Sequence, residues 1–377
     1  MRLQVLIVPE WHPWPEAPVE GSWVREQARA AALECDVAIL ATRPGAPTLR
    51  PRLELTESVE EGLRTVRVRY AASRLPKATF ARRVRAMAAG AAHLRRSGFT
   101  PEVVHAHVFS AGFPAALLAR RMRVPLVVSE HYTGFPRGTL SRWDRLIAKR
   151  TFRAADLVCP ASADLARHLE RLQRHARFRP MPNVVDTNVF FPPAAELEGP
   201  ARLLNVASLH DKKGHAHLLR AFAHVRSERP DALLEVVGDG PRRAELERLA
   251  ERLGVGGVVR FLGTREKDEV AQLMRSAHLF VLASLWENAP HVVIEALASG
   301  LPVVATDVGG VAELLPPEAG TLVPAADPDA FARAALELLE RQSQLDREAL
   351  AATAEARFGH EAVGRLWAEV YGELAGR

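Results

Sequence analysis

Short runs of β-branched and aliphatic residues alternate with longer helical patterns along almost the whole chain, and this alternation restricts the possible folds more than any other feature. Strands that alternate with helices form parallel sheets covered by helices on both faces. We therefore expect an α/β protein. The predicted strands are residues 3–8, 36–41, 64–70, 103–107, 126–129 and 157–160 in the first half, and 203–207, 233–237, 258–262, 279–283, 303–306 and 321–324 in the second.

The length of 377 residues is sufficient for two domains, each with its own core. A proline-rich stretch, residues 180–193, is the natural connection between them. We expect an N-terminal domain over residues 1–185, a C-terminal domain over 186–358 and a final helix over 359–377. Two doubly wound parallel sheets in tandem would direct the carboxyl ends of their strands toward a central cleft, where ligands bind in open α/β sheets.

Cellular location is constrained by hydropathy and by cysteine. No apolar run approaches the roughly 18–20 residues of a membrane-spanning helix, and residues 3–8 are too few for a signal peptide. Cys35 and Cys159 lie in apolar, strand-like surroundings without the spacing of a metal or disulfide motif. These features predict reduced, buried thiols and a cytoplasmic protein, either free or attached peripherally to the inner face of the membrane.

The two halves of the chain differ in charge. Residues 1–190 contain 30 Lys and Arg against 17 Asp and Glu, whereas the remainder contains 20 against 28. Residues 74–96 are densely basic and interleaved with apolar side chains, which is typical of a surface for anionic lipid or an anionic acceptor. The alternative is an ordinary solvated helix face. Nucleic acid is not expected as a partner, because Phe80 is nearly the only aromatic residue among these arginines.

Glu287 and Glu295 lie eight positions apart across a predicted junction between a loop and a helix. Pro290 suits the first helical position, so the amides around residues 288–292 would form a helix N-terminus, which attracts anions such as phosphate. An anion flanked by two carboxylates fits a nucleotide sugar, with the diphosphate in the middle and a sugar ring on each side. The alternatives are the paired carboxylates of a glycosidase, or two glutamates without a binding role.

The stretch from Glu287 to Gly310 resembles the signature of glycosyltransferase family 4, in which Glu, seven residues and a second Glu precede a small-residue helix, Gly-x-Pro-Val-Val and Gly-Gly. Further stretches match the family in its order along the chain. These are Glu20-Gly21-Ser22-Trp23, Val128-Ser129-Glu130-His131, Pro182-Asn183-Val184-Val185-Asp186, Val237-Gly238-Asp239-Gly240-Pro241 and Phe261-Leu262-Gly263. Together the matches cover nearly the whole chain.

The resemblance implies the GT-B fold, with two Rossmann-like domains and a last helix that crosses back to the first. It implies a retaining transfer of sugar from a UDP- or GDP-sugar, held by the C-terminal domain, to a glycan or lipid-linked acceptor, held by the N-terminal domain, in polysaccharide or glycolipid assembly. Glu287 would hold hydroxyls of the transferred sugar and Glu295 those of the ribose. The backbone at Asn288, Ala289, Pro290, His291 and Val292 would serve the diphosphate, and the base would lie near Leu262, Gly263 and Thr264.

The cation for the leaving group is expected to be Lys213, which follows a predicted strand and opens a helix. A lysine there acts as a point charge on the departing diphosphate. Ser208 stands where many members of the family have an arginine. One cation near the diphosphate is therefore missing, and Lys212, His210 or an arginine of the other domain would substitute for it.

Two residues of the N-terminal half complete the expected site. Gly21 opens a helix after residues 13–20, where a glycine allows the backbone to approach phosphate or sugar closely. His131 ends a predicted strand and corresponds to the histidine that lies beside the reacting carbon in the resembled family. His131, Glu287 and Lys213 are thus the expected catalytic residues.

Three patterns could suggest a metal, but each has a simpler explanation. His105 and His107 share one face of a predicted strand without an evident third ligand, and we expect packed histidines there, as for His215 and His217. Asp327-Pro328-Asp329 precedes a helical pattern, and N-capping explains it. We expect no metal and no cofactor beyond the sugar nucleotide. Other functions left open are a nucleotide-sugar epimerase or glycogen-type synthase of the same fold, and a non-enzymatic basic binding module.

Overall fold

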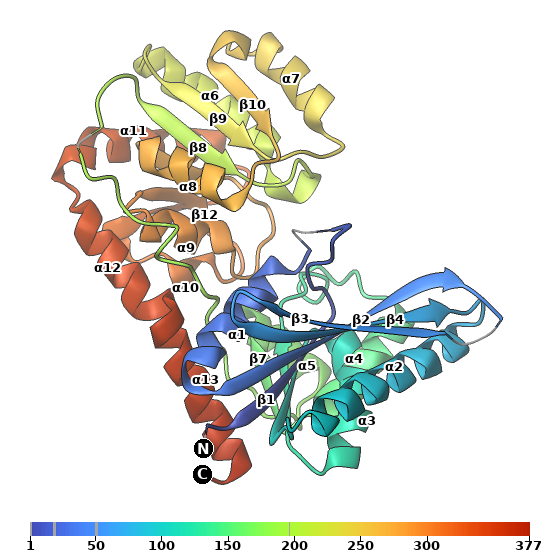
Figure 1. The fold of residues 1–377 in the computed structure, drawn as a ribbon. Helices are drawn as coiled ribbons and strands as arrows, with labels where there is room; N and C mark the ends of the chain where they lie inside the picture. Colours follow the sequence, from blue (N-terminus) through green and yellow to red (C-terminus); the bar gives the residue numbers. More distant parts are fainter. Residues whose placement is uncertain (1, 18–19, 50–51, 196) are drawn as a thin grey trace. The chain divides into compact units, whose positions relative to one another are not determined.

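The computed structural model describes residues 2–17, 20–49, 52–195 and 197–377. The chain forms two compact units, one made of Met1–Val184 with His360–Arg377 and the other of Val185–Gly359. Each unit has one central sheet with helices packed on it (Figure 1). No helix in the described part of the chain is long and apolar enough to cross a membrane.

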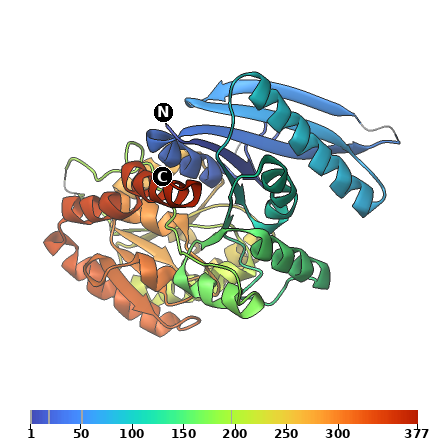
Figure 2. The same cartoon turned by 90° about the horizontal axis from the view of Figure 1, so that it is seen from below.

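The sheet of the first unit has seven strands in the order β3-β4-β2-β1-β5-β6-β7, and its pairings are parallel except that of β3 with β4. The strands are β1 (Gln4–Pro9), β2 (Asp36–Pro47), β3 (Leu53–Glu60), β4 (Leu63–Ala72), β5 (Val103–His107), β6 (Leu126–Glu130) and β7 (Leu157–Pro160). The helices are α1 (Ser22–Glu34), α2 (Pro76–Arg96), α3 (Phe109–Met122), α4 (Arg142–Ala154), α5 (Ala163–Leu172) and α13 (His360–Ala375). Figure 2 shows α2 lying along β2 and β4, which it contacts.

One strand of this sheet is absent from the sequence prediction. The segment Leu53–Glu60 forms β3, an edge strand whose side chains are exposed or only half-buried. Because neither face of β3 is buried, charged and apolar residues mix along it and no hydrophobic pattern marks it. On the other side of β4, β2 runs on to Pro47, six residues beyond the predicted end.

The last helix, α13, packs in the first unit against α1. Trp367 and Tyr371, one turn apart on α13, are fully buried. The indole of Trp367 donates a hydrogen bond to Oε1 of Gln27 at 2.6 Å. At Gly364 a Cβ atom would lie 2.3 Å from the carbonyl oxygen of Ala30, so the missing side chain is what lets the two helices approach each other.

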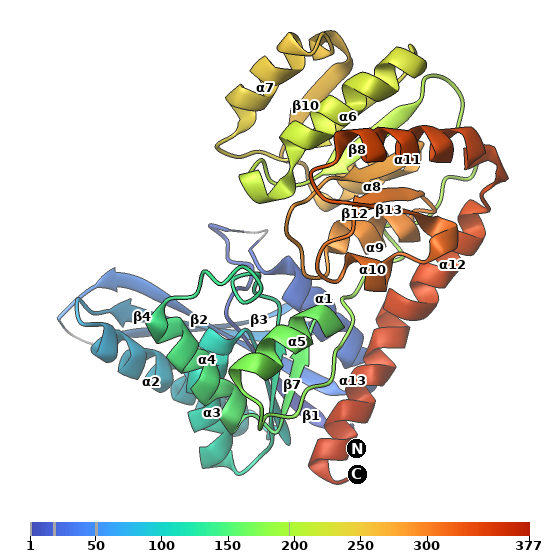
Figure 3. The ribbon, with the colours of Figure 1, turned by 180° about the vertical axis from the view of Figure 1, so that it is seen from behind.

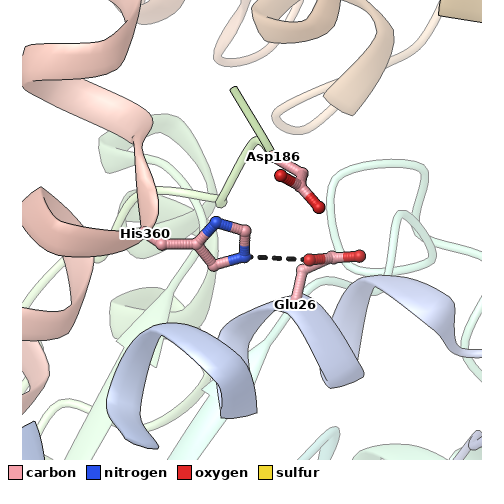
Figure 4. A group of neighbouring side chains, drawn as sticks. All are labelled: Glu26, Asp186 and His360. Carbon is pink, nitrogen blue, oxygen red and sulfur yellow. Dashed lines mark hydrogen bonds and ion pairs between the residues drawn. The ribbon is translucent and has the colours of Figure 1, made fainter. Parts of the chain in front are cut away.

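The first residue of α13 is fixed as well. Nε2 of His360 lies 2.9 Å from Oε2 of Glu26 on α1, and Figure 4 shows the two side chains pointing at each other. Arg29 donates to the same carboxylate oxygen at 3.1 Å. The nearly buried carboxylate of Glu26 therefore ties the beginning of α13 to α1.

The sheet of the second unit has six parallel strands in the order β10-β9-β8-β11-β12-β13. They are β8 (Arg202–Val206), β9 (Leu233–Val237), β10 (Val259–Gly263), β11 (Leu279–Leu282), β12 (Val303–Thr306) and β13 (Gly320–Val323). The helices are α6 (His215–Glu228), α7 (Arg243–Arg252), α8 (Lys267–Ser276), α9 (His291–Ala298), α10 (Val311–Leu314), α11 (Pro328–Arg341) and α12 (Arg347–Phe358). α6 and α11 pack side by side on one face of this sheet (Figure 3).

Candidate active site

The residues singled out in the second unit lie beyond the carboxyl ends of its strands. Ser208 and Lys213 follow β8, Gly263 ends β10, and Glu287 follows β11. The first strand of this sheet, β8, has β9 on one side and β11 on the other. The chain adds β9 and β10 on the first side of β8, and β11, β12 and β13 on the opposite side. A crevice forms at such a switch of direction, and it is the usual ligand site of an open α/β sheet.

An ion pair spans this point of the sheet. Nζ of Lys213, in the short 3₁₀ helix η1 (Asp211–Lys213) after β8, lies 2.5 Å from Oε1 of Glu287 after β11. The hydroxyl of Ser284 donates to the same oxygen at 2.7 Å. Glu287 is only 8% exposed and Lys213 is half-buried. The cation and the carboxylate are therefore held in fixed positions, partly shielded from water.

Two glycines bring the loops of this site together. Gly214 has a φ of +66°, and a Cβ atom there would lie 1.8 Å from the carbonyl oxygen of Ala283. Gly309, after β12, has a φ of +57°, and its Cβ would lie 2.1 Å from the carbonyl oxygen of Glu287. A side chain at either position would push apart the loops that position the Lys213–Glu287 pair.

The helix after the ion pair, α9, begins one residue later than the sequence predicted. Pro290 is its N-cap rather than its first helical residue, because its ψ of 122° is extended while its carbonyl already accepts a hydrogen bond from the amide of Val293. Asn288, Ala289 and Pro290 are buried beside the pair. Glu295 lies within α9, half-buried, five residues past the cap and thus roughly 7 Å along the axis.

The residues expected near the base lie at the end of β10, two strands from β8, which precedes Lys213, and three from β11, which precedes Glu287. Leu262 and Gly263 end this strand, Thr264 follows it, and two strand spacings amount to roughly 10 Å. The amide of Gly238 donates to the carbonyl of Gly263 at 2.9 Å. The glycine turn after β9 therefore lies between the end of β10 and the end of β8.

Sequence reasoning missed one cation at this edge. Nη2 of Arg243, in the first turn of α7, donates to the carbonyl of Phe261 at 3.0 Å, and Nη1 lies close to Gly263. Ser208 itself is exposed in the loop after β8 and contributes no charge. The position of Arg243, two residues after the turn Gly238–Pro241, was the signal that could have drawn attention to it.

In the first unit, Gly21 and His131 lie at the carboxyl edge of the sheet. Gly21 is the N-cap of α1 with a φ of +69°, and a Cβ atom there would lie 2.2 Å from the carbonyl oxygen of Trp11. His131 directly follows β6. The ring of Trp23 lies 4.2 Å from that of His131 between centroids, and the ring of His107 stacks on His131 at 5.9 Å. These contacts hold the imidazole of His131 in place.

Two family models match the chain, one after the other. Residues 21–184 match the glycosyl transferase 4-like domain, and residues 187–357 match glycosyl transferases group 1. The D-inositol 3-phosphate glycosyltransferase of Streptomyces bingchenggensis is 31% identical over 92% of this chain and 82% of its own length. The chain is a glycosyltransferase of the GT4 type.

Other relatives and solved structures agree with this assignment. The putative glycosyltransferase EpsF of Bacillus subtilis is 36% identical over 54% of this chain and 57% of EpsF. The glycogen synthase of Mycobacterium tuberculosis is 29% identical over 72% of this chain and 68% of its own. Sucrose-phosphate synthase from Thermosynechococcus elongatus superposes with a TM-score of 0.78 at 23% identity, covering 99% of both chains. HepE from Anabaena in complex with UDP-glucose superposes with a TM-score of 0.74 at 19% sequence identity, covering 98% of this chain and 100% of HepE. The predicted GT-B fold is confirmed.

The glycosyltransferase has a buried carboxylate beside His131 that sequence reasoning did not single out. Glu130 is fully buried and accepts backbone hydrogen bonds from Phe109, His131 and Tyr132, each at 2.9 Å. Burial raises the pKa of Glu130 to about 7, although the three amides act in the opposite direction. Val108, before Phe109, has a strained φ of 74°. Glu130 thus connects the end of β6 to the beginning of α3.

His105 and His107 of the glycosyltransferase are packed side chains, as predicted. Nδ1 of His105 lies 2.7 Å from the hydroxyl of Tyr371, and its Nε2 lies 2.8 Å from that of Ser129. His107 is buried beside it, with the ring centroids 4.3 Å apart. Burial lowers the pKa of His105 to about 3, so the ring is neutral at physiological pH.

The remaining polar motifs also have local roles. His215 is buried at the start of α6, and burial together with Lys213 lowers its pKa to about 4. His217 is half-buried on the same helix. Oδ1 of Asp327 accepts a hydrogen bond from the amide of Ala330 at 2.9 Å, which confirms the predicted N-cap of α11.

Proposed function

We propose that this glycosyltransferase moves a sugar, with retention of its anomeric configuration, from a nucleoside-diphosphate donor to an acceptor hydroxyl in polysaccharide or glycolipid assembly. The observation that carries the proposal is the Lys213–Glu287 pair, held beyond β8 and β11 next to the N-terminus of α9. A cation, helix amides and an ordered carboxylate within one crevice provide separate places for a diphosphate and a hydroxylated ring.

Each group has a proposed role in the transfer. In the transition state, negative charge grows on the departing diphosphate while the sugar becomes positively charged. Lys213 and the amides at the N-terminus of α9 stabilise the diphosphate without moving, because the fold already holds them in place. Glu287 accepts hydroxyls of the transferred sugar, and Glu295, farther along α9, accepts those of the ribose. Since a lysine and amides balance the leaving-group charge, we propose no metal.

The donor is proposed to be a UDP- or GDP-sugar. HepE, which shares the fold at 19% identity, was solved in complex with UDP-glucose, and this likeness supports a nucleoside-diphosphate donor. The separation of roughly 10 Å between the carboxyl ends of β8 and β10 leaves room for a ribose between diphosphate and base. Arg243 lies beside Gly263, and its guanidinium pairs with Glu247 at 2.9 Å and with Asp239 at 3.5 Å. To contact the base, or to replace the arginine absent at position 208, it must exchange these pairs for the donor.

The first unit is proposed to bind a glycan or lipid-linked acceptor. His131 would contact the transferred sugar from this side, and Gly21 would let the backbone approach it closely. The stacking of Trp23 and His107 on His131 supports such a role, because a ring that contacts a substrate must keep one orientation.

A glycogen-type synthase is the second candidate, favoured by the 29% identity with glycogen synthase. Donor turnover with and without added acceptors separates the possibilities. Release of nucleotide that requires an oligosaccharide primer favours the synthase. Conversion of the donor sugar without any acceptor indicates an epimerase instead. The anomeric configuration of the product, read by NMR, tests retention directly.

The donor site is tested by thermal-shift measurements with UDP-, GDP-, ADP- and TDP-sugars on the wild type, Glu295→Ala and Glu340→Ala. Glu340 is the matched control, because it is an exposed glutamate on α11 of the same unit. A ligand at 100 times its Kd stabilises the native state by about 2.7 kcal/mol. We expect one nucleotide to raise Tm in the wild type and the control but not in Glu295→Ala. Absence of stabilisation by any nucleotide at millimolar concentration would contradict the donor site.

A further inference from the structure

Two arginines of α2, Arg82 and Arg83, are engaged inside the first unit. Nη1 of Arg82 donates to the carbonyl oxygens of Thr48 and Ala72 at 2.9 and 2.6 Å. Nη2 of Arg83 pairs with Oε2 of Glu10 at 2.7 Å. These two arginines hold α2 against the sheet, whereas the other basic residues of the segment 74–96 are exposed; they are Arg74, Lys77, Arg85, Arg95 and Arg96.

A second helix of the unit, α4, also presents exposed positive charge. Its basic residues are all exposed, and none of them forms an ion pair with any residue that the structure describes; they are Arg142, Arg145, Lys149, Arg150 and Arg153. The single acidic residue of the helix, Asp144, is hydrogen-bonded to its N-cap Ser141. Trp143 projects from the same helix with 72% of its surface exposed. The outer side of α4 is therefore basic and carries an unburied indole.

A cavity of about 510 Å³ lies between α4, the end of α5 and the loop before α4. Four cationic side chains line it, Arg142, Arg145, Lys149 and Arg171, and none of the described residues of its lining carries a carboxylate. Its apolar lining includes Leu146 and Leu172. Four like charges around one cavity repel one another unless an anion lies among them, and the apolar side chains provide contact for an uncharged chain attached to that anion.

We propose that this cavity binds the phosphate headgroup of an anionic lipid and attaches the first unit to an anionic bilayer through α4. Charge complementarity selects a phosphate, because arginines bind phosphate oxygens with paired N–H groups. The exposed indole of Trp143 selects a bilayer rather than a soluble phosphate ester, because indoles favour the interface between headgroups and acyl chains. The attachment requires neither sugar donor nor acceptor, so it stands apart from the proposed function.

The test is co-sedimentation of the full chain with phosphatidylcholine vesicles containing 0–40% phosphatidylglycerol. The cavity variant is Arg145→Gln/Lys149→Gln. Its matched control is Arg120→Gln/Arg121→Gln, which removes the same charge from two exposed positions on α3 of the same unit. A basic residue at an anionic surface contributes about a factor of five, so the cavity variant should bind roughly 30-fold more weakly. The control should change by less than about threefold.

Two further readouts separate the possible ligands. The emission attributable to Trp143, taken as the difference between wild type and Trp143→Phe, should shift to the blue when anionic vesicles are added. Glycerol 1-phosphate at millimolar concentration should leave vesicle binding unchanged. Equal loss in both double variants would show diffuse charge attraction and overturn the assignment to the cavity. Stabilisation by glycerol 1-phosphate without vesicle binding would identify a soluble phosphate ester as the ligand and overturn the membrane proposal.

Discussion

Removal of the Lys213 charge should destabilise the second unit, and a second substitution should restore most of the loss. In Lys213→Met, the carboxylate of Glu287, which is 8% exposed in the wild type, keeps one partner among the described residues, the hydroxyl of Ser284 at 2.7 Å. Breaking a buried pair on one side costs about 3–5 kcal/mol, and the lower value applies here because 15% of the lysine side chain is exposed. In Lys213→Met/Glu287→Gln no buried charge is left unpaired, so we expect a deficit of only about 1 kcal/mol.

The measurement is urea unfolding of the wild type, both single variants and the double variant. With an m-value of about 3 kcal/mol/M, Lys213→Met should lower the midpoint by about 1 M. Hydrogen exchange of peptides covering residues 279–306 reports the second unit separately. The coupling free energy from the four proteins should be about 2 kcal/mol plus the loss measured for Glu287→Gln alone. A double variant no more stable than Lys213→Met would refute the reasoning, since the loss would then not arise from an unpaired carboxylate.

The remaining predictions concern a glycine and a histidine of the second unit. Gly309→Ala should lower the free energy of unfolding by several times the roughly 1 kcal/mol expected for Gly254→Ala, because both have a positive φ but only Gly309 has a backbone oxygen, that of Glu287, within 2.1 Å of the new Cβ. Equal losses of unfolding free energy in Gly309→Ala and Gly254→Ala would rule out the steric explanation. His215 has a folded pKa of about 4, below its ordinary 6.5, so the unfolded chain binds more protons between these values and stability falls as the pH falls. His215→Leu should lack this pH dependence. As the pH falls from 6.5 to 4, its free energy of unfolding should rise relative to that of the wild type by up to about 1.4 kcal/mol per pH unit. Parallel plots of unfolding free energy against pH for the two proteins would contradict the prediction.

Hydrophobic patterning located nearly all of the strands, because buried parallel strands are continuous apolar runs of limited length. It failed at β3, where an edge strand buries neither face. The same logic explains the end of β2: its last residues, up to Pro47, are exposed and carry no apolar signal. Pattern reasoning thus succeeds where burial dictates composition and fails where it does not.

By itself, the sequence determined the fold class, the family and the residue types of the site. Local spacing sufficed for these, because glycines at tight turns and carboxylates around a helix N-terminus follow from backbone geometry over a few residues. Only the tertiary structure decided which charges meet and which remain free. Lys213 and Glu287 are 74 residues apart, and strand order brings them to 2.5 Å. Arg82 looks as free as Arg145 in the sequence, yet the carbonyls that occupy it come from a distant strand end. Charge pairing depends on contacts between segments far apart in the chain, and no local pattern encodes it.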